Sequence, residues 1–341
     1  MDWKDVVRQV NEDRIGKEDV SSKQRDLYML GGDGSLVFRK GNGETEIKRG
    51  MMSEWSSRQL YEKLGIPVPY ARRMPSDILA MNVNYWLTAE PDKEIMLRYR
   101  DDNIRGVLSG RYQPYDNYPV IEAVDKCLEG AAVHVDSFHL DDLGFHLKMT
   151  SPELETRVGN LLDGSADIIT SGFYVTNSEV GARAVRIGYY IKRLICSNGL
   201  IGTRAKDFFY QRHMGLSQIQ FEVGVAEGIG KALKASNETV TALVEARARK
   251  VESPAEIIKR IVQSNRLSQQ FQDEVMIAYG TEQALSGDND FSVIQAFTRA
   301  AHGLEVNKRV EVETLAGYML DHSLLAASRN YVSELVENAV A

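Results

Sequence analysis

Alternating apolar and polar residues between Val185 and Ile195 constrain the fold more than any other segment of the chain. One face of this pattern is apolar and the other is largely polar: Val185, Ile187, Tyr189 and Ile191 against Arg186, Gly188, Tyr190 and Lys192. A period of two is typical of a β-strand with one buried face. Its predicted partner is the segment 168–176, joined to it through Asn177-Ser178-Glu179-Val180-Gly181, in which Asn and Gly tolerate a turn. We therefore predict an antiparallel pair whose second face is exposed and basic.

Three more segments read as β-hairpins. Leu27-Tyr28-Met29-Leu30 and Leu36-Val37-Phe38 flank a run of Gly31-Gly32-Asp33-Gly34, which supplies the positive φ of a hairpin turn. A second hairpin is predicted over 95–109 and a third over 133–149, each around an Asp-rich turn. These segments predict an antiparallel sheet.

Helical signals interrupt and then follow the strands. Ser53 can cap a helix that ends at Gly65, and another is expected to begin near Ser76. After about residue 221 the composition becomes rich in Ala, Glu, Lys, Leu and Gln at helical spacing.

Three or four helices are expected in this last part of the chain. Ser253-Pro254-Ala255-Glu256 reads as a capping box, Asp290 as a second cap, and the segment from Val310 to Val336 as one or two more helices. The predicted fold is α+β, with an antiparallel-sheet domain over 1–220 and a helical region over 221–341.

Composition narrows the class of protein. The chain has 341 residues, 43% of them hydrophobic, and two cysteines, Cys127 and Cys196, which are too few for a disulfide framework. The N-terminus has acids where a signal peptide has a cationic segment, and no apolar run has the length of a membrane span. We expect a globular protein of the cytoplasm, without membrane association.

Charge is distributed unevenly along the chain. The protein carries a formal net charge of -7, yet the segment 179–212 has seven basic residues against Glu179 and Asp207. The basic residues are Arg183, Arg186, Lys192, Arg193, Arg204, Lys206 and Arg212. Such a patch attracts a partner with repeated negative charge, for which a nucleic-acid backbone is the leading candidate.

The exposed strand face combines cations with aromatic rings. Arg186, Tyr190 and Lys192 share it, and Tyr174 lies on the neighbouring strand, so phosphates and unpaired bases both have partners there. The alternative is a face that the C-terminal helices cover and pair with their acids. Arg193 falls on the opposite, apolar side, where its charge needs to reach solvent or an acid.

Arg105, Arg111 and Tyr112 form a second candidate contact for nucleic acid, with Arg111 the preferred residue. Arg111 and Tyr112 open the loop Gln113-Pro114-Tyr115-Asp116-Asn117 and could project a guanidinium and a ring from the end of a strand. The alternative is that Tyr112 and Tyr115 close the edge of the sheet.

Histidines in the hairpin over 133–149 raise the question of a metal. Its expected register sets Asp136 opposite His146 and His134 opposite Lys148. A lysine beside the ligands disfavours a cation, so we predict no metal. The chain also has no phosphate-binding loop, dinucleotide fingerprint or zinc-protease motif, so we expect neither a cofactor nor an enzyme.

Several motifs resemble a family of phage/plasmid-like proteins of unknown function. They are Arg58-Gln59-Leu60, Gly65-Ile66-Pro67-Val68-Pro69-Tyr70, Leu108-Ser109-Gly110-Arg111-Tyr112-Gln113-Pro114-Tyr115-Asp116-Asn117, Val175-Thr176-Asn177-Ser178-Glu179-Val180-Gly181, Arg193-Leu194-Ile195-Cys196-Ser197-Asn198-Gly199-Leu200 and Ala296-Phe297-Thr298-Arg299-Ala300-Ala301. The resemblance implies a mobile-element protein of a bacterial host, encoded near replication and recombination genes.

Two functions stay open at this point. The first is non-catalytic binding of nucleic acid, single-stranded DNA in particular, during replication or recombination. The second is a protein-interaction or assembly factor whose basic face is neutralised internally. Homo-oligomers are compatible with both, and the sequence does not choose between DNA and RNA.

Overall fold

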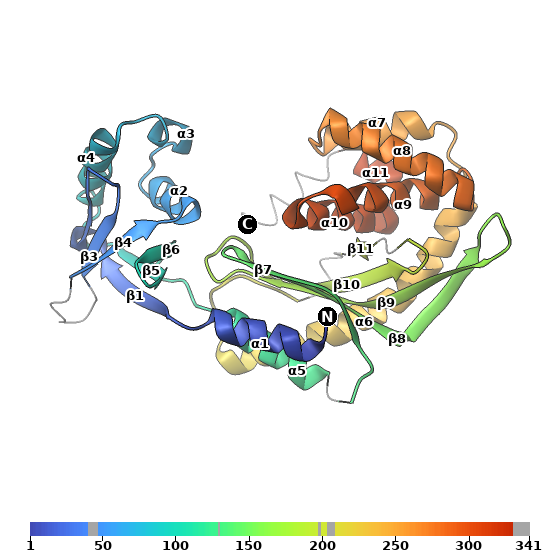
Figure 1. Ribbon diagram of the computed structural model, residues 1–341, viewed down its shortest axis with the longest axis horizontal. Helices are drawn as coiled ribbons and strands as arrows, with labels where there is room; N and C mark the ends of the chain where they lie inside the picture. Colours follow the sequence, from blue (N-terminus) through green and yellow to red (C-terminus); the bar gives the residue numbers. More distant parts are fainter. Residues whose placement is uncertain (40–46, 129, 197–198, 203–208, 330–341) are drawn as a thin grey trace.

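The computed structural model has two lobes, each with its own six-stranded β-sheet and hydrophobic core (Figure 1). It describes residues 1–39, 47–128, 130–196, 199–202 and 209–329. Helix accounts for 46% and strand for 28%, with the helices concentrated in the C-terminal part. The α+β prediction is therefore confirmed.

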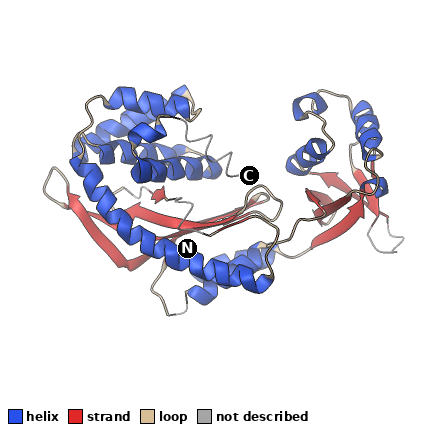
Figure 2. Ribbon diagram, turned by 180° about the vertical axis from the view of Figure 1, so that it is seen from behind, coloured by secondary structure: helices blue, strands red, loops and turns tan. Residues whose placement is uncertain are grey.

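The first lobe contains a mixed sheet in the order β1-β5-β6-β4-β3-β2. Its strands are β1 (Lys17–Lys23), β2 (Leu27–Met29), β3 (Leu36–Arg39), β4 (Ile47–Met52), β5 (Glu94–Arg100) and β6 (Asn103–Ser109), with a 3-10 turn η1 (Gln24–Asp26) after β1. All neighbours are antiparallel except β4 and β6, which are parallel. Three helices lie together on one side of this sheet: α2 (Glu54–Lys63), α3 (Val68–Ala71) and α4 (Ser76–Leu87) (Figures 1 and 2).

Local signals explain the elements of this lobe. The hairpin of β2 and β3 is confirmed, with Gly34 at φ 71° in its turn. Ser53 caps α2 by accepting a hydrogen bond from the Ser56 amide, and Gly65 follows the helix at φ 69°. The hairpin predicted over 95–109 is the pair β5 and β6.

The second lobe contains a sheet in the order β11-β10-β9-β8-β7, with β12 pairing to β10. Its strands are β7 (His134–Asp141), β8 (Gly144–Asn160), β9 (Ala166–Asn177), β10 (Val185–Arg193), β11 (Gly199–Ile201) and β12 (Tyr210–Gln211). Every pairing is antiparallel, and the predicted pairing of the 168–176 segment with Val185 onward is confirmed.

Helices cover both faces of the second sheet (Figures 1 and 2). On one side lie α1 (Trp3–Asp13), α5 (Asn117–Cys127) and the long α6 (Gln218–Ala248). On the other lie α7 (Pro254–Ser264), α8 (Gln269–Ser286), α9 (Asp290–Ala300), η2 (Ala301–Gly303), α10 (Val306–His322) and α11 (Leu324–Ala327). The helical character predicted after residue 221 is confirmed from Gln218 onward.

Three local expectations are wrong. Ser253 precedes α7 but makes no side-chain cap, and Asn289, one residue before Asp290, caps α9. The hairpin β7–β8 turns at Asp141–Gly144 and pairs His139 with His146 and His134 with Thr150. The position of this turn sets a register different from the expected one, and a bulge between Val135 and Ser137 shifts it by one residue, so neither predicted cross-strand pair forms.

The two cores divide the chain differently from the predicted boundary near residue 220. Helices α5 to α10 share one continuous core with the second sheet and with Val6 and Val10 of α1. The first sheet packs on its own core under α2 and α4. The first lobe is thus an insertion between α1 and α5, and residue 220 lies within the segment that belongs to the second lobe.

Within the described ranges, no helix combines the length and the apolar character required to cross a bilayer.

We expect the core of the second lobe to dominate stability. Ile294 of α9 is fully buried, whereas Ile277 of α8 is 75% exposed. Replacing Ile294 with Ala should lower the free energy of unfolding by about 2–5 kcal/mol, because it leaves a cavity. Ile277→Ala is the matched control and should change stability little. Urea unfolding monitored by circular dichroism measures both, and equal effects would contradict this assignment of the core.

Candidate functional site

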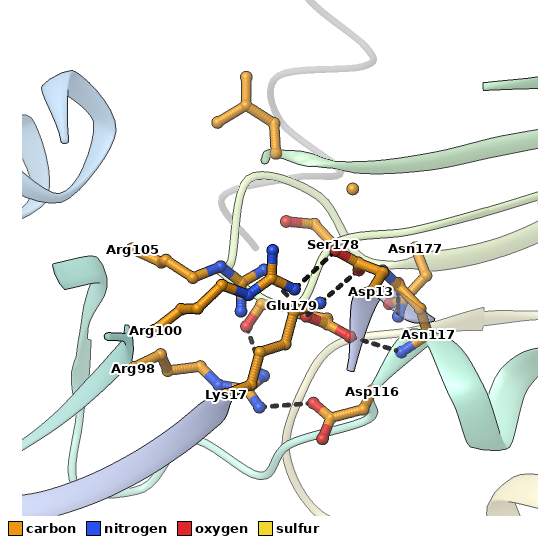
Figure 3. Close-up of polar contacts among 12 residues, drawn as sticks. Asp13, Lys17, Arg98, Arg100, Arg105, Asp116, Asn117, Asn177, Ser178 and Glu179 are labelled. Carbon is orange, nitrogen blue, oxygen red and sulfur yellow. Dashed lines mark hydrogen bonds and ion pairs between the residues drawn. The ribbon is translucent and has the colours of Figure 1, made fainter. Parts of the chain in front are cut away.

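The loop between β9 and β10 carries a buried carboxylate into the junction of the two lobes (Figure 3). Glu179 is only 3% exposed. Its Oε2 accepts hydrogen bonds from Lys17 Nζ at 2.6 Å and from Arg105 at 2.9 Å. Its Oε1 accepts one from the Asn117 amide at 3.0 Å. The chain passes between the lobes twice, once just before β1 and once just before α5. The Glu179 side chain bonds to a residue at each of these two passages.

A second layer of charge surrounds this carboxylate. Arg98, which is 2% exposed, donates to Asp19 at 2.8 Å, to Asp116 at 2.6 Å and to the carbonyl of Glu179 at 2.7 Å (Figure 3). Arg100 pairs with Asp13 at 2.7 Å. Each buried cation therefore meets a carboxylate, as burial of charge requires.

Backbone contacts of the same loop complete the junction. The carbonyl of Val180 accepts hydrogen bonds from Trp55 Nε1 at 2.9 Å and from Gln59 Nε2 at 2.8 Å. Both donors belong to α2, so this helix of the first lobe holds a loop of the second.

The junction strongly perturbs two titrating groups. Burial acts to raise the pKa of Glu179, but the charges of Lys17 and Arg105 outweigh it and lower that pKa to about 2. Burial and the nearby Arg98 lower the pKa of His213 to about 4. Glu179 is thus ionised and His213 neutral at neutral pH.

Tyr112 belongs to this junction and not to an open surface. Its ring stacks on His213 at 4.8 Å, and its hydroxyl donates to the Glu179 carbonyl at 2.9 Å. The burial that follows raises its pKa. The interpretation of Tyr112 and Tyr115 as rings that close the sheet edge fits these contacts, since Tyr115 is 1% exposed. Arg111 beside it is exposed, and no carboxylate of the described residues pairs with it.

The predicted basic sheet face is covered by α10. Tyr174 and Tyr190 are 5% and 4% exposed and pack with Val310. Lys148, opposite Tyr174 on the neighbouring strand β8, forms a buried ion pair with Glu313 of α10. The expectation of an exposed face is therefore wrong, because a helix distant in the sequence lies on it.

The cations of that face have internal partners. Arg183 contacts His146 and donates to Asn307 Oδ1 at 2.8 Å, while Lys192 pairs with Asp136. Arg186 lies over the Tyr210 ring at 5.0 Å. Arg193, predicted on the apolar side, is 1% exposed there and pairs with Asp167 and Glu282. Among the described cations of this segment, Lys192 and Arg193 thus pair with carboxylates, and Arg183 and Arg186 contact neutral groups of the fold.

Three further cations were predicted to belong to the basic face. Arg212 is half-buried and has an interaction within the protein. Arg204 and Lys206 lie outside the described residues.

The histidine-bearing hairpin shows no metal geometry. His146 Nδ1 lies 2.5 Å from the Tyr174 hydroxyl, and burial with the Arg183 charge lowers the His146 pKa to about 4. Among the described residues, no group of three or more His, Cys, Asp or Glu could hold a metal ion. That the protein binds no metal stays a prediction.

The helical layer of the first lobe carries an exposed set of basic and aromatic residues that the sequence analysis did not single out as a site. We call it the α2–α4 surface: Arg58, Tyr70, Arg72, Arg73, Tyr85 and Trp86. The three rings are 58%, 67% and 44% exposed, and the three arginines are also exposed. Arg58 and Arg72 make ion pairs with Glu62 and Glu54, but all four side chains are more than half exposed, so these pairs are weak.

A sequence signal for this surface exists. Between residues 47 and 75 the chain has six basic residues against Glu54 and Glu62, while the whole protein is negative. The segment 179–212 has a larger excess of basic residues, so the sequence predicts the binding face there.

A groove of about 370 Å³ adjoins this surface. Four methionines, Met29, Met51, Met52 and Met74, line it together with Tyr61 and Leu79. Arg58 and Arg72 line its edge, with Glu54 and Asp33.

Comparisons with protein-family models, with curated proteins and with solved structures find no match. The residues themselves therefore carry the functional argument.

We expect Glu179→Gln to lower the free energy of unfolding at pH 7 by about 3 kcal/mol, because it leaves Lys17 and Arg105 without their buried counter-charge. The pKa of Glu179 in the folded protein lies below its ordinary value of 4.5, so this contribution is present above about pH 4.5 and is lost as pH falls toward about 2. The difference between wild type and variant should therefore shrink over that range.

Urea unfolding across a pH series measures this difference. Glu62→Gln, which removes an exposed carboxylate that pairs with Arg58, is the control and should have little effect. A constant difference from pH 7 to pH 3 would show that the Glu179 charge is not responsible.

Proposed function

We propose that this chain is a non-catalytic nucleic-acid-binding protein that takes single strands on the α2–α4 surface. The observation that carries the proposal is that one helical layer exposes both guanidinium groups and aromatic rings. Tyr70, Arg72 and Arg73 are the main examples. Guanidinium groups contact phosphates, and rings stack on unpaired bases without regard to sequence.

Electrostatics favour this surface over the predicted sheet face. The net excess of four positive charges between residues 47 and 75 stands against a total of -7. A local patch of this kind attracts a polyanion although the whole molecule repels it. The cations at Lys148, Lys192 and Arg193 already pair with buried or partly buried carboxylates, and freeing them would cost those pairs.

Replication or recombination of a phage or plasmid, in the cytoplasm of a bacterial host, is the setting that the family resemblance implies. We include it in the proposal on that ground. A single-strand preference follows from the rings, since bases inside a duplex do not offer their faces.

A second candidate is a protein-interaction or assembly factor, with the basic sheet face neutralised internally. One observation favours it: α4 exposes Ile78, Met81 and Tyr85 on the side opposite its buried residues. Spacings of three and four place these side chains in one stripe of the helix, as in a surface that packs against a partner.

A binding titration with labelled single-stranded DNA, duplex DNA and RNA at several salt concentrations tests the first function. If about 4 phosphates are neutralised, log affinity for single-stranded DNA should fall with log salt at a slope of roughly -3. Arg72→Ala and Arg73→Ala should each reduce the slope by about 0.7. Tyr70→Ala should weaken binding by about 1–3 kcal/mol and leave the slope nearly unchanged.

Lys308→Ala is the matched control, because Lys308 is an exposed cation on α10, in the other lobe. It should bind as wild type does. Absence of binding at low salt would refute the function. A slope that responds to Arg186→Ala with Lys192→Ala, and not to Arg72→Ala, would move the site to the sheet face.

A further inference from the structure

The methionine-lined groove of the first lobe has the composition of a ligand site. Its wall and floor are apolar, with Met29, Tyr61 and Leu79 buried and Met52 and Met74 half-buried. Its volume of about 370 Å³ falls in the range of small-molecule sites. The lining suits a flat aromatic group, because thioethers are polarizable and adapt to the edges of rings.

The edge of the groove is polar and carries guanidinium groups held only in exposed ion pairs. Arg58 and Arg72 line it, and Arg49 reaches its Asp33. Asp33, Glu54 and Glu62 pair with Arg49, Arg72 and Arg58, but these pairs are solvent-exposed and weak, so the guanidinium groups can exchange them for phosphates. Arg73, directly after Arg72, is exposed and adds a further cation beside the edge.

This combination matches a nucleotide better than an uncharged ligand. The base is a flat ring for the apolar interior, and its phosphates are anions for the guanidinium groups. A base inside a duplex costs a few kcal/mol to extrude, whereas a base in a single strand is already free to turn.

We propose that this groove receives one unstacked base of a bound single strand, with Arg58 and Arg72 on the flanking phosphates; this inference rests on the proposed function. Tyr70, on α3 between the groove residues Val68 and Arg72, then stacks on a neighbouring base. The groove would hold one nucleotide at a defined position, while the rest of the strand binds the α2–α4 surface without regard to sequence.

Ser76 allows the groove to be blocked without disturbing the core. It lines the groove, is exposed, and is the first residue of α4, where its side chain makes no cap. Ser76→Trp should fill the groove. Gln218→Trp is the matched control, because Gln218 is exposed at the first position of α6, in the other lobe. Unchanged urea midpoints would show that both variants fold.

The experiment compares a thymidine oligonucleotide with a fully abasic one of equal length, at one salt concentration. Wild type should prefer the strand with bases, and Ser76→Trp should bind that strand about tenfold more weakly while binding the abasic strand as wild type does. A 2-aminopurine probe in the strand should change fluorescence on binding to wild type and to Gln218→Trp, and much less with Ser76→Trp.

The outcomes separate this inference from the proposed function. If Ser76→Trp binds as wild type does, while Arg72→Ala weakens binding, the groove is not a base site and the function stands. If wild type binds no strand, both are wrong. If an acidic amphipathic helical peptide binds as tightly as the oligonucleotide and Ser76→Trp removes only the peptide, the groove belongs to a protein partner and the inference is overturned.

Discussion

The structure depends on one buried carboxylate. Glu179 sits at the end of a loop from the second sheet and takes hydrogen bonds from Lys17 and Arg105 of the first sheet and from the first residue of α5. These contacts lie where the chain leaves the second lobe and where it returns. Because taking ions out of water is costly, such a junction is stable only when every charge has its partner, and this requirement sets the relation of the two lobes.

The same requirement explains the positions of three basic residues in the second lobe. Lys148, Lys192 and Arg193 all face carboxylates contributed by elements far away in the sequence: Glu313 on α10, Asp136 on β7 and Glu282 on α8. The pairs with Glu313 and Glu282 connect strands of the second sheet to the helices that cover it, and the pair with Asp136 connects two strands of the sheet. Basic residues that are concentrated in the sequence, such as Lys192 and Arg193, therefore form ion pairs inside the fold.

The basic residues that remain exposed on the α2–α4 surface pair only with exposed acids. Arg58 and Arg72 pair with exposed acids of the same lobe, and Arg73 has no ion pair among the described residues. Exposed pairs of this kind cost little to exchange for phosphates. The helical layer of the first lobe is thus the better surface for a polyanion, although the segment 179–212 has the larger charge.

The helices and strands were predicted from interactions between residues close in the sequence. The period of two between Val185 and Ile191, the glycine turn before Leu36 and the cap at Ser53 each depend on neighbours within a few residues, and each is present. Errors at the same scale had small causes: the turn at Asp141–Gly144 and the bulge at β7 set the register of one hairpin, and Asn289 rather than Asp290 caps α9.

The sequence by itself determined the α+β class, the antiparallel pairing of the central strands and the helical C-terminal third, because hydrophobic periodicity and turn residues are read locally. The tertiary structure decided which face of the central sheet is covered, where the two cores divide, and that Glu179 joins them. Those outcomes depend on contacts between residues as distant as Lys148 and Glu313, and no local pattern records which helix lies on which face.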